Sequence, residues 1–415
     1  MLELADSPYR RDPLSQDGIA DLPAFYRELR DDHPVYYCED YDTFFFSRFE
    51  HVWDLLRIGG NVFTAVETNL PTPDYLRRTR NTGNPPPFAS TEPMAAMPAL
   101  ASPWYEEMRH AHIAPFRPKA VLELADFIRE VTRARLDTLL PLGRFDMVRE
   151  FAGVVAAASI CRLFGLPVES AQELFDDVNE ATRPAADGSV DFALFFAKVI
   201  GKIGPCVAAR RAAGADGSNR LIDGLINYRV NGTRALGDKE ISDQLVCAMV
   251  GGLESASKVT AGGIMELWRN PPQLDEVRAD LAANVPLAVN EMVRHCAPAQ
   301  YTFRTAHQDV SIGGADIRAG QRVCAMLWSA AHDEREFAEP ERFIWNRPAW
   351  RTVSFGLGQH HCLGKHLALL EVRIMTEEFL ARVPQFRFDM EGAARNPSYF
   401  QHGWIRLPVI IGEGT

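Results

Sequence analysis

The segment Phe355–Gly364 places a cysteine between two glycine-containing turns and directly before a run that favours a helix. The run from Lys365 to Val372 contains no glycine or proline, so Cys362 should lie at or just before a helix N-terminus. The free N–H groups and the partial positive charge at that end stabilise a thiolate and can donate hydrogen bonds to its sulfur. The sequence therefore predicts a fold that presents a reactive or metal-binding sulfur.

This segment resembles the haem-binding signature of the cytochrome P450 family, Phe-x-x-Gly-x-x-x-Cys-x-Gly. The resemblance implies that Cys362 is the axial ligand of a haem iron, to which its sulfur donates electron density that favours cleavage of the O–O bond. It also implies that Phe355, Gly356 and Gly364 contact the haem b (iron protoporphyrin IX) from this loop.

The histidines around the cysteine allow a second interpretation, because His360, His361, Cys362 and His366 are residue types that bind zinc. Adjacent histidine and cysteine side chains rarely all point at one ion, and the chain has no Cys-x-x-Cys pair to complete such a site. The remaining cysteines are expected to be small buried residues: Cys38, Cys161, Cys206, Cys247, Cys296 and Cys324.

Composition limits the class of protein. The chain has 415 residues, of which 47% are hydrophobic, and its formal net charge of −11 disfavours nucleic-acid binding. It begins without a basic and then apolar segment, and it contains no apolar stretch of about 18 residues, so we expect a cytoplasmic protein with no membrane contact. Because the motifs spread along the chain serve one site, the sequence predicts a single domain over residues 1–415, although length alone suggests two or three.

A long helix is predicted from Asp238, a suitable N-cap, to Asn270, after which Pro271 and Pro272 end it. About 30 residues span about 45 Å, which is enough to cross the molecule. The middle of this stretch is apolar on every side, as is typical of a buried helix.

Within this helix, the segment from Gly251 to Ser255 resembles the oxygen-binding segment of cytochromes P450, Ala/Gly-Gly-x-Asp/Glu-Thr. Glycines inside a helix cost about 1 kcal/mol each against alanine, and the resemblance implies that Gly251 and Gly252 let haem and O₂ approach the backbone. It also implies that Glu254 relays protons. The hydroxyl of Ser255 can donate a hydrogen bond to the carbonyl of Gly251, four residues back, and loosen the helix there.

The family usually has threonine at the position of Ser255, and Ala256 follows where a second hydroxyl is common. Serine keeps the hydrogen-bond donor but lacks the methyl group that restricts the rotamers. We expect proton delivery to persist with looser geometry, and the change puts the coupling of electrons to product in question. The alternative is a serine and a glutamate tolerated in a helix that is kinked for packing.

A Glu-x-x-Arg pair, Glu291 and Arg294, follows Pro286, which we expect to open a helix. Alone, such a pair is usually an ordinary surface ion pair. Its place about 70 residues before Cys362 resembles that of the Glu-x-x-Arg element of cytochromes P450, and Arg347 matches the third member of that family's charged triad. The resemblance implies a structural triad that fixes the helix against the cysteine loop.

The two propionates of a haem need cations or hydrogen-bond donors where they are buried. His360, Arg304 and Arg109 match propionate ligands of the family. The family often has His-x-x-x-Arg where this chain has Tyr105 and Arg109, and a phenol can still donate a hydrogen bond. The alternative for each residue is a solvated or interface charge.

The resemblance covers about residues 20–412 and implies the cytochrome P450 fold. This fold is mainly α with a smaller β-rich portion, here at roughly residues 30–60, 300–325 and 385–412, and haem lies between the long helix and the cysteine loop. Local patterns predict a helix over 22–29, hairpins at 35–46 and 310–317, and a late strand over 407–411. Residues 60–103 are rich in proline, glycine, asparagine and threonine and are expected to form a long irregular loop.

The resemblance implies a monooxygenase that uses O₂ to hydroxylate or oxidatively dealkylate a small, largely apolar or aromatic substrate. The chain carries no flavin or iron–sulfur domain, so we expect electrons from NAD(P)H to reach a monomeric enzyme through a separate ferredoxin reductase and ferredoxin. The basic residues expected to dock the ferredoxin are Arg109, His112, Arg117, Lys119 and Lys365. Two alternatives stay open: a haem-thiolate enzyme that uses peroxide or rearranges its substrate, and a non-catalytic haem- or zinc-binding protein.

Overall fold

The structure is a computed structural model. It describes residues 12–14, 22–58, 62–65, 67, 71–79, 84–183, 191–348, 351–396 and 401–412.

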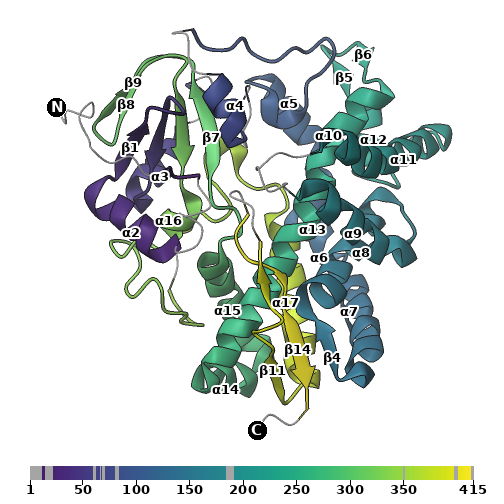
Figure 1. The fold of residues 1–415 in the computed structure, drawn as a ribbon. Helices are drawn as coiled ribbons and strands as arrows, with labels where there is room; N and C mark the ends of the chain where they lie inside the picture. Colours follow the sequence, from purple (N-terminus) through teal and green to yellow (C-terminus); the bar gives the residue numbers. More distant parts are fainter. Residues whose placement is uncertain are drawn as a thin grey trace.

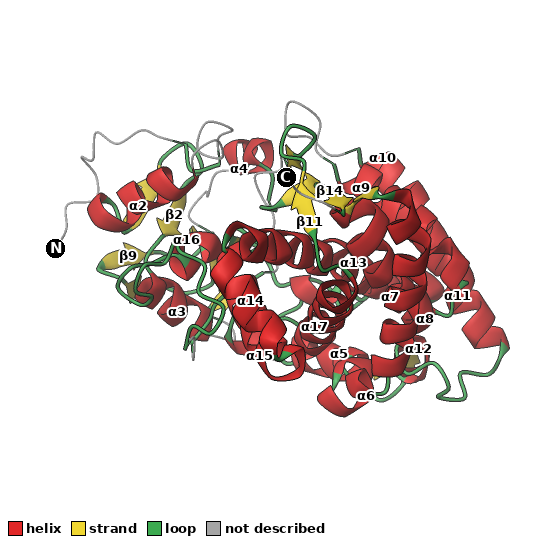
Figure 2. Ribbon diagram, turned by 90° about the horizontal axis from the view of Figure 1, so that it is seen from below, coloured by secondary structure: helices red, strands yellow, loops and turns green. Residues whose placement is uncertain are grey.

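Helices make up most of the regular structure (Figures 1 and 2). The α-helices are α2 (Leu22–Asp32), α3 (Phe49–Arg57), α4 (Pro73–Arg78), α5 (Trp104–His112), α6 (Pro118–Leu122), α7 (Ala125–Leu139), α8 (Gly153–Phe164), α9 (Ala171–Thr182), α10 (Phe192–Phe195), α11 (Gly201–Ala212), α12 (Ile222–Asn227), α13 (Asp238–Arg269), α14 (Pro271–Ala279), α15 (Leu281–Cys296), α16 (Leu327–Ala331) and α17 (Lys365–Arg382). Shorter 3₁₀ or π turns are η2 (Met97–Ala99), η3 (Ala114–Phe116), η4 (Leu140–Leu142), η5 (Met147–Ala152), η6 (Val168–Ser170), η7 (Phe196–Ile200) and η8 (Gly358–His360).

The strands are short and form small sheets. They are β1 (Val35–Cys38), β2 (Thr43–Phe46), β3 (Phe63–Thr64), β4 (Arg144–Asp146), β5 (Arg229–Val230), β6 (Arg234–Ala235), β7 (Thr302–Ala306), β8 (Val310–Ile312), β9 (Ala315–Ile317), β10 (Arg322–Ala325), β11 (Phe386–Phe388), β12 (Ala394–Arg395), β13 (Trp404–Arg406) and β14 (Pro408–Ile411). The largest sheet among the described residues has the order β1-β2-β10-β7-β3, and a second has the order β11-β14-β4. The pairing of β2 with β10 is parallel, whereas the other pairs in these two sheets are antiparallel.

Alternation of side chains explains why β2 is apolar along its length. Phe44 and Phe46 join the apolar cluster that contains Phe49 of α3, whereas Phe45 joins the cluster that contains Tyr26 of α2. Successive side chains of a strand point to opposite faces, so β2 is buried from both sides. The largest sheet therefore lies between these two helices, beside the helical part of the molecule (Figure 1).

The helix α13 runs through the centre of the helical part and packs against α8, α15, α17 and η5 (Figures 1 and 2). Its 32 residues span about 48 Å. At its start, the Glu240 carboxylate accepts a hydrogen bond of 2.7 Å from the N–H of Gly237. The chain thus caps its longest helix locally before it enters the apolar core.

The mainly α fold with a smaller β portion is confirmed, and four local predictions need correction. The segment predicted as β-rich at 30–60 also contains α3, and the segment 60–103 contains β3 and α4. The signal for α4 was present in the sequence, because Thr72 accepts a hydrogen bond of 3.1 Å from the N–H of Tyr75 and Pro73 follows it.

The other two corrections concern helix starts. Gly237 is the N-cap of α13 and Asp238 is its first helical residue. Pro286 lies inside α15 and does not open it, because the side chain of Asp280 accepts a hydrogen bond of 3.1 Å from the N–H of Ala283 and caps the helix earlier. A helix of 16 residues tolerates the single backbone bond that proline cannot donate.

None of the helices in the described ranges is both long and apolar enough to cross a lipid bilayer.

Candidate active site

The cysteine loop connects η8 to α17 and is held by backbone contacts. The N–H of Cys362 donates to the carbonyl of Phe355 at 2.8 Å, and Gly356 and Gly358 have positive φ values of 65° and 63°. A Cβ on Gly358 would lie 2.5 Å from the carbonyl oxygen of Leu56, at the end of α3. Glycine is therefore required at 358 both by its conformation and by this close approach.

The Cys362 side chain lies at the start of α17 and is exposed. Burial raises the pKa of its thiol, whereas the backbone of Gly364 and Lys365 and the charge of Arg109 lower it. A side chain surrounded by protein on most sides but open on one satisfies both observations. The N–H groups of the helix start are thus placed to stabilise a thiolate, and a metal ion bound to the sulfur displaces its proton outright.

Four predicted propionate ligands come together beside this loop, and we call Tyr105, Arg109, Arg304 and His360 the donor cluster. The Tyr105 hydroxyl donates to the carbonyl of Gln359 at 3.0 Å and accepts from Arg109 at 3.1 Å. The rings of Tyr105 and His360 are 4.2 Å apart, and Arg109 also donates to the carbonyl of His361 at 2.8 Å. The donor cluster therefore joins α5 to the cysteine loop.

The donor cluster has an excess of positive charge. Burial lowers the pKa of Arg304 to about 10, and burial together with the charges of Arg304 and Arg109 lowers the pKa of His360 to about 3. In the described part of the chain, no Asp or Glu side chain pairs with Arg109 or Arg304 within 4.0 Å. Two buried or half-buried guanidinium groups without a counter-ion fit a ligand with two carboxylates, as the haem propionates are.

The predicted glycines divide into two kinds. A Cβ on Gly251 or on Gly364 would meet no protein atom within 4 Å, and neither has a positive φ. A Cβ on Gly252, in contrast, would lie 2.4 Å from Cδ1 of Ile160 on α8. Close packing of α13 on α8 thus gives a structural reason for Gly252, and its expected role beside O₂ stays a prediction. Protein packing does not explain Gly251 and Gly364, which leave room for a flat group against the backbone.

The two polar side chains of the α13 motif engage different partners. The Ser255 hydroxyl donates to the carbonyl of Gly251 at 3.1 Å, so that predicted hydrogen bond is confirmed. The Glu254 carboxylate is buried, and it accepts from the hydroxyl of Thr182 at 2.8 Å and from Nζ of Lys258 at 3.0 Å. The acid is therefore directed toward α9.

The predicted charged triad is a closed network. Arg294 donates twice to the Glu291 carboxylate, at 2.7 and 2.8 Å, and Arg347 donates to the same carboxylate at 3.0 and 3.1 Å. Glu291 also accepts from the N–H of Ile344 at 3.0 Å, and Arg294 donates to the carbonyl of Ala331 at 2.8 Å. The triad joins α15 to the chain that leads into the cysteine loop.

The sequence reading missed a buried acid on α17. Glu371 has an exposed fraction of 2%, its Oε1 has no hydrogen-bond partner, and burial raises its pKa to about 8 despite a contact with Ser159. Its type and position in a predicted helix were visible in the sequence, but the periodicity did not show that it faces inward. Glu371 is therefore a buried carboxyl group whose surroundings favour its neutral form.

Two predicted exposures are wrong. Cys247 is exposed on α13, one turn before Gly251, although it was expected to be buried. His112, expected at the docking surface, has an exposed fraction of 1%, and its ring nitrogens face the carbonyls of Met108 and Gln244. It packs between α5 and α13 and cannot meet a partner protein.

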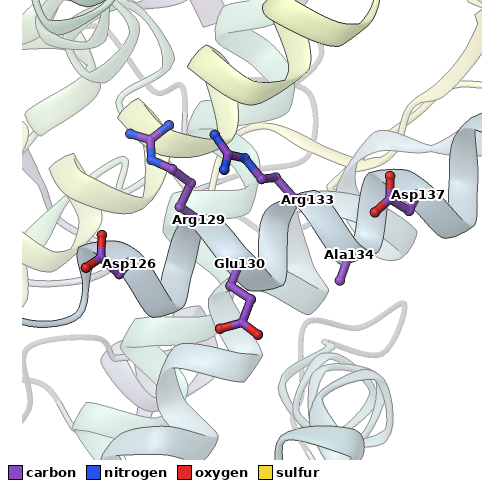
Figure 3. Close-up of a pocket in the computed structure, with 6 residues that line it drawn as sticks. All are labelled: Asp126, Arg129, Glu130, Arg133, Ala134 and Asp137. Carbon is purple, nitrogen blue, oxygen red and sulfur yellow. The ribbon is translucent and has the colours of Figure 1, made fainter.

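A surface pocket of about 410 Å³ lies elsewhere, along α7 (Figure 3). Its arginines project on one side of the helix, and Arg129 and Arg133 already pair with Glu378 of α17. Their charges are neutralised, so this pocket does not resemble a substrate site. The described residues also contain no cluster of three or more His, Cys, Asp or Glu side chains arranged to hold a metal ion.

Known proteins resemble the chain in sequence and in fold. A sequence model of the family Cytochrome P450 matches residues 192–409. A steroid C26-monooxygenase of Mycolicibacterium smegmatis is 32% identical over 311 residues, which cover 72% of this chain and 75% of that protein. A methyl-branched lipid omega-hydroxylase of Mycobacterium tuberculosis is 31% identical over 327 residues, which cover 77% and 75%.

Among solved structures, that of CYP109E1 from Bacillus megaterium in complex with testosterone superimposes with a TM-score of 0.80. It covers 96% of this chain and 100% of that chain at 21% sequence identity. The two proteins therefore share their fold.

Proposed function

The chain belongs to the cytochrome P450 family and is a monooxygenase, and we propose that it hydroxylates or oxidatively dealkylates an apolar organic substrate with electrons from a separate ferredoxin. The observation that carries this proposal is the exposed Cys362 at the start of α17, next to the carboxylate-free donor cluster. Cys362 would hold the iron of haem b, and Arg109, Arg304, His360 and Tyr105 would hold its propionates, with Phe355, Gly356 and Gly364 in the same loop.

A haem in this site supplies the activation of O₂. The chain contributes protons and a dry environment. The Ser255 hydroxyl donates to the carbonyl of Gly251, and a hydroxyl can both release and accept a proton, so Ser255 would hold a proton for delivery in this part of α13. Glu254, the residue before Ser255, is the nearest acid in the sequence, and its buried carboxyl group would supply a new proton to that hydroxyl.

The relatives and the exposed residues in the middle of α13 support a proposal for the substrate class. The named relatives oxidise a steroid and a methyl-branched lipid. Cys247 and Gly251 are exposed in the middle of α13, and neither carries a charge, which suits an apolar substrate. We therefore place the substrate among steroid- or lipid-like molecules.

The electron donor would dock beside the cysteine loop. Arg117 and Lys119 are exposed at the start of α6, and Lys365 is half-buried at the start of α17. Next to them, a groove of about 310 Å³ between α6, α15 and α17 is lined mainly by apolar side chains such as Leu122 and Leu369. A ferredoxin with an acidic surface fits these charges, and NAD(P)H would reach it through a ferredoxin reductase.

The test removes the sulfur. Cys362→Ala should abolish thiolate-ligated haem and product formation, as shown by loss of the red-shifted absorption band of the carbon monoxide adduct. Cys206→Ala, at a buried position on α11, should keep the band. A retained band in Cys362→Ala would refute the ligand assignment.

The electron supply is tested separately. Wild-type enzyme with NAD(P)H and substrate should form product only after ferredoxin and its reductase are added. Turnover with hydrogen peroxide alone, and none with the complete reductase system, would favour the peroxide-using alternative.

A further inference from the structure

The Lys258 side chain occupies an unusual place on α13, one turn after Glu254. Its exposed fraction is 2%, and its ammonium group donates to the Glu254 carboxylate at 3.0 Å and to the side-chain oxygen of Gln401. The carbon stem packs against Gly403, where a Cβ would lie 3.2 Å from Cβ of Lys258 and where φ is +126°. The glycine thus makes room for a lysine that points along the helix at the acid.

Packing alone does not explain a lysine here. Removing an ammonium group and a carboxylate from water costs several kcal/mol for each ion, and a pair of apolar residues of the same volume is often equally stable. Lys258 is buried where α13 packs against the strand β13, so both charges of the pair are kept from water. The buried pair therefore points to a task that depends on charge.

The other contact of the acid carries a second clue. The hydroxyl of Thr182, the last residue of α9, lies 2.8 Å from Oε1 of Glu254 and 2.8 Å from the carbonyl oxygen of Val178. A hydroxyl has one proton to donate and can accept as well. It can therefore satisfy only one of these two acceptors at a time.

Two hydrogen-bond arrangements follow for the same atoms. When Glu254 is charged, Thr182 donates to Oε1. When Oε1 carries a proton, Glu254 donates to Thr182, which turns its own proton to the carbonyl of Val178. The carboxyl group keeps this hydrogen bond in both protonation states, as a group that repeatedly gains and loses a proton requires.

We propose that Thr182 and Lys258 are positioning residues for proton delivery by Glu254. Lys258 fixes the carboxylate in the orientation that faces α9, and Thr182 keeps a hydrogen bond to that group whether it accepts or donates. This inference rests on the proposed proton-relay role of Glu254. A monooxygenase consumes one O₂, two electrons and two protons for each product and each water that it forms. The protons come from solvent through Glu254, and the electrons come from NAD(P)H.

The experiment compares Thr182→Val, which removes the hydroxyl at nearly constant volume, with Thr182→Ser, which keeps it. Thr260→Val is the matched control, because Thr260 likewise donates to the carbonyl four residues back, at 2.9 Å on α13, and has no hydrogen bond to Glu254 among the described residues. Thr260 is buried and Thr182 is half-buried, so the control is the more demanding change for packing. In the holoenzyme with its reductase system, product and hydrogen peroxide are measured per NAD(P)H. Product formation driven by added hydrogen peroxide, which brings its own protons, is measured in parallel.

We expect Thr182→Val to lower product per NAD(P)H by at least about threefold and to release the missing electrons as peroxide. Its peroxide-driven rate should stay within about twofold of wild type, and Thr182→Ser and Thr260→Val should keep wild-type coupling. Coupling in Thr182→Val equal to that in Thr260→Val would overturn the role of Thr182. An equal fall in the peroxide-driven rate would overturn it too, since it would show general damage.

The lysine is tested without turnover, by urea unfolding of Lys258→Met, Glu254→Gln and the double variant. Lys258→Met alone leaves a buried carboxylate without a cation, so we expect its unfolding midpoint to fall further than that of the double variant. Lys239→Met, which removes an exposed ion pair with Asp243 at the same four-residue spacing on α13, is the control and should shift the midpoint little. Additive effects of the two single changes would refute the pairing. If wild-type enzyme shows no NAD(P)H-driven turnover, the proposed electron supply fails while this cycle still decides on the pair.

Discussion

The charged triad and the donor cluster both bury arginine side chains, but they balance the charge in different ways. Arg294 and Arg347 have side-chain exposed fractions of 0% and 6%, and both donate to the Glu291 carboxylate. Arg304 is buried as well, yet it donates only to the hydroxyl of Thr302 and the carbonyl of Phe303 among the described residues. Both arginines of the triad share a carboxylate partner, whereas Arg304 pairs with no Asp or Glu side chain among the described residues, and an anion from outside the chain would balance its charge.

This difference distinguishes buried charges that stabilise the fold from buried charges that bind a ligand. A buried cation that the protein neutralises serves the fold, and its loss should damage every state of the protein. A buried cation that the protein leaves without a counter-ion lowers stability until a ligand supplies the charge. Removing a paired arginine of the charged triad should therefore lower the free energy of unfolding. Removing an unpaired buried arginine of the donor cluster should raise it when no ligand is bound.

The largest effect is expected from Glu291→Gln. The change leaves Arg294 and Arg347 buried without a counter-charge, so we expect the free energy of unfolding to fall by about 3–5 kcal/mol. Urea unfolding of the haem-free protein measures it. Glu339→Gln is the matched control, because Glu339 and Arg342 form the same Glu-x-x-Arg pair with exposed fractions of 63% and 62%. This control should change stability by less than about 1 kcal/mol, and similar effects of the two changes would remove the distinction.

The pairs Glu291/Arg294 and Glu339/Arg342 also show where sequence reasoning ends. Both have the same spacing, and only the resemblance to a family marked the first as structural. The long helix, the cysteine loop and the mainly α fold were predictable because they depend on local features: helix-forming runs, proline stops and glycine turns. Burial depends on which distant segment covers a side chain, and no local pattern carries that information.

The site was predictable to a similar extent. The donor cluster was found by motif, and the hydrogen bond from Ser255 to Gly251 follows from helix geometry. Thr182 could not be found, because its partner Glu254 lies 72 residues away in the chain. His112 was misplaced because an exposed and a buried helix face differ only in what packs on them.

The next prediction concerns a variant that should be favourable for stability without haem and unfavourable for haem binding. Arg304→Leu removes a buried cation that lacks a counter-ion, so the haem-free protein should be as stable as wild type or more stable. The loaded protein should lose haem at least about tenfold faster, because a charge-assisted hydrogen bond to a propionate is lost. Unfolding of the haem-free form and haem transfer to an acceptor protein measure the two quantities.

Arg322→Leu is the control for this prediction. Arg322 is equally buried, but it pairs with Glu67, so its loss should destabilise the protein with and without haem. If Arg304→Leu also destabilised both forms, the donor cluster would be structural.

A smaller effect concerns a buried acid without a counter-charge. Burial raises the pKa of Glu371 to about 8 from the ordinary value of 4.5. Between these values the folded protein keeps a proton that the unfolded chain has released, so stability should fall as the pH rises from about 5 to about 8. Glu371→Gln should remove this part of the pH dependence and leave the variant relatively more stable at pH 8. Urea unfolding across that range measures it.

Glu378, on the same helix, provides the opposite case. Burial acts to raise its pKa, but hydrogen bonds from Arg133 and Arg129 prevail and lower it. Its contribution to stability is present above its unfolded pKa and is lost as the pH falls, so Glu378→Gln should cost stability at pH 7 and lose less than wild type on acidification. A pH profile of Glu371→Gln parallel to that of wild type would contradict the assignment of Glu371 as a neutral buried group.

The smallest effect on stability is expected for an exposed cation, Arg117→Glu at the start of α6. Water screens this charge, so the free energy of unfolding should change by less than about 0.5 kcal/mol. The apparent KM for an acidic ferredoxin should nevertheless rise several-fold at low salt, and the difference should shrink near 0.5 M salt, because salt screens steering by exposed charges.

Arg78→Glu on α4, which Figures 1 and 2 place away from α6, should leave that KM unchanged. Equal KM values for Arg117→Glu and Arg78→Glu would move the docking surface away from α6. Replacing an exposed, a paired or an unpaired arginine would still change the free energy of unfolding by different amounts. A function would then be proposed only for the buried arginines.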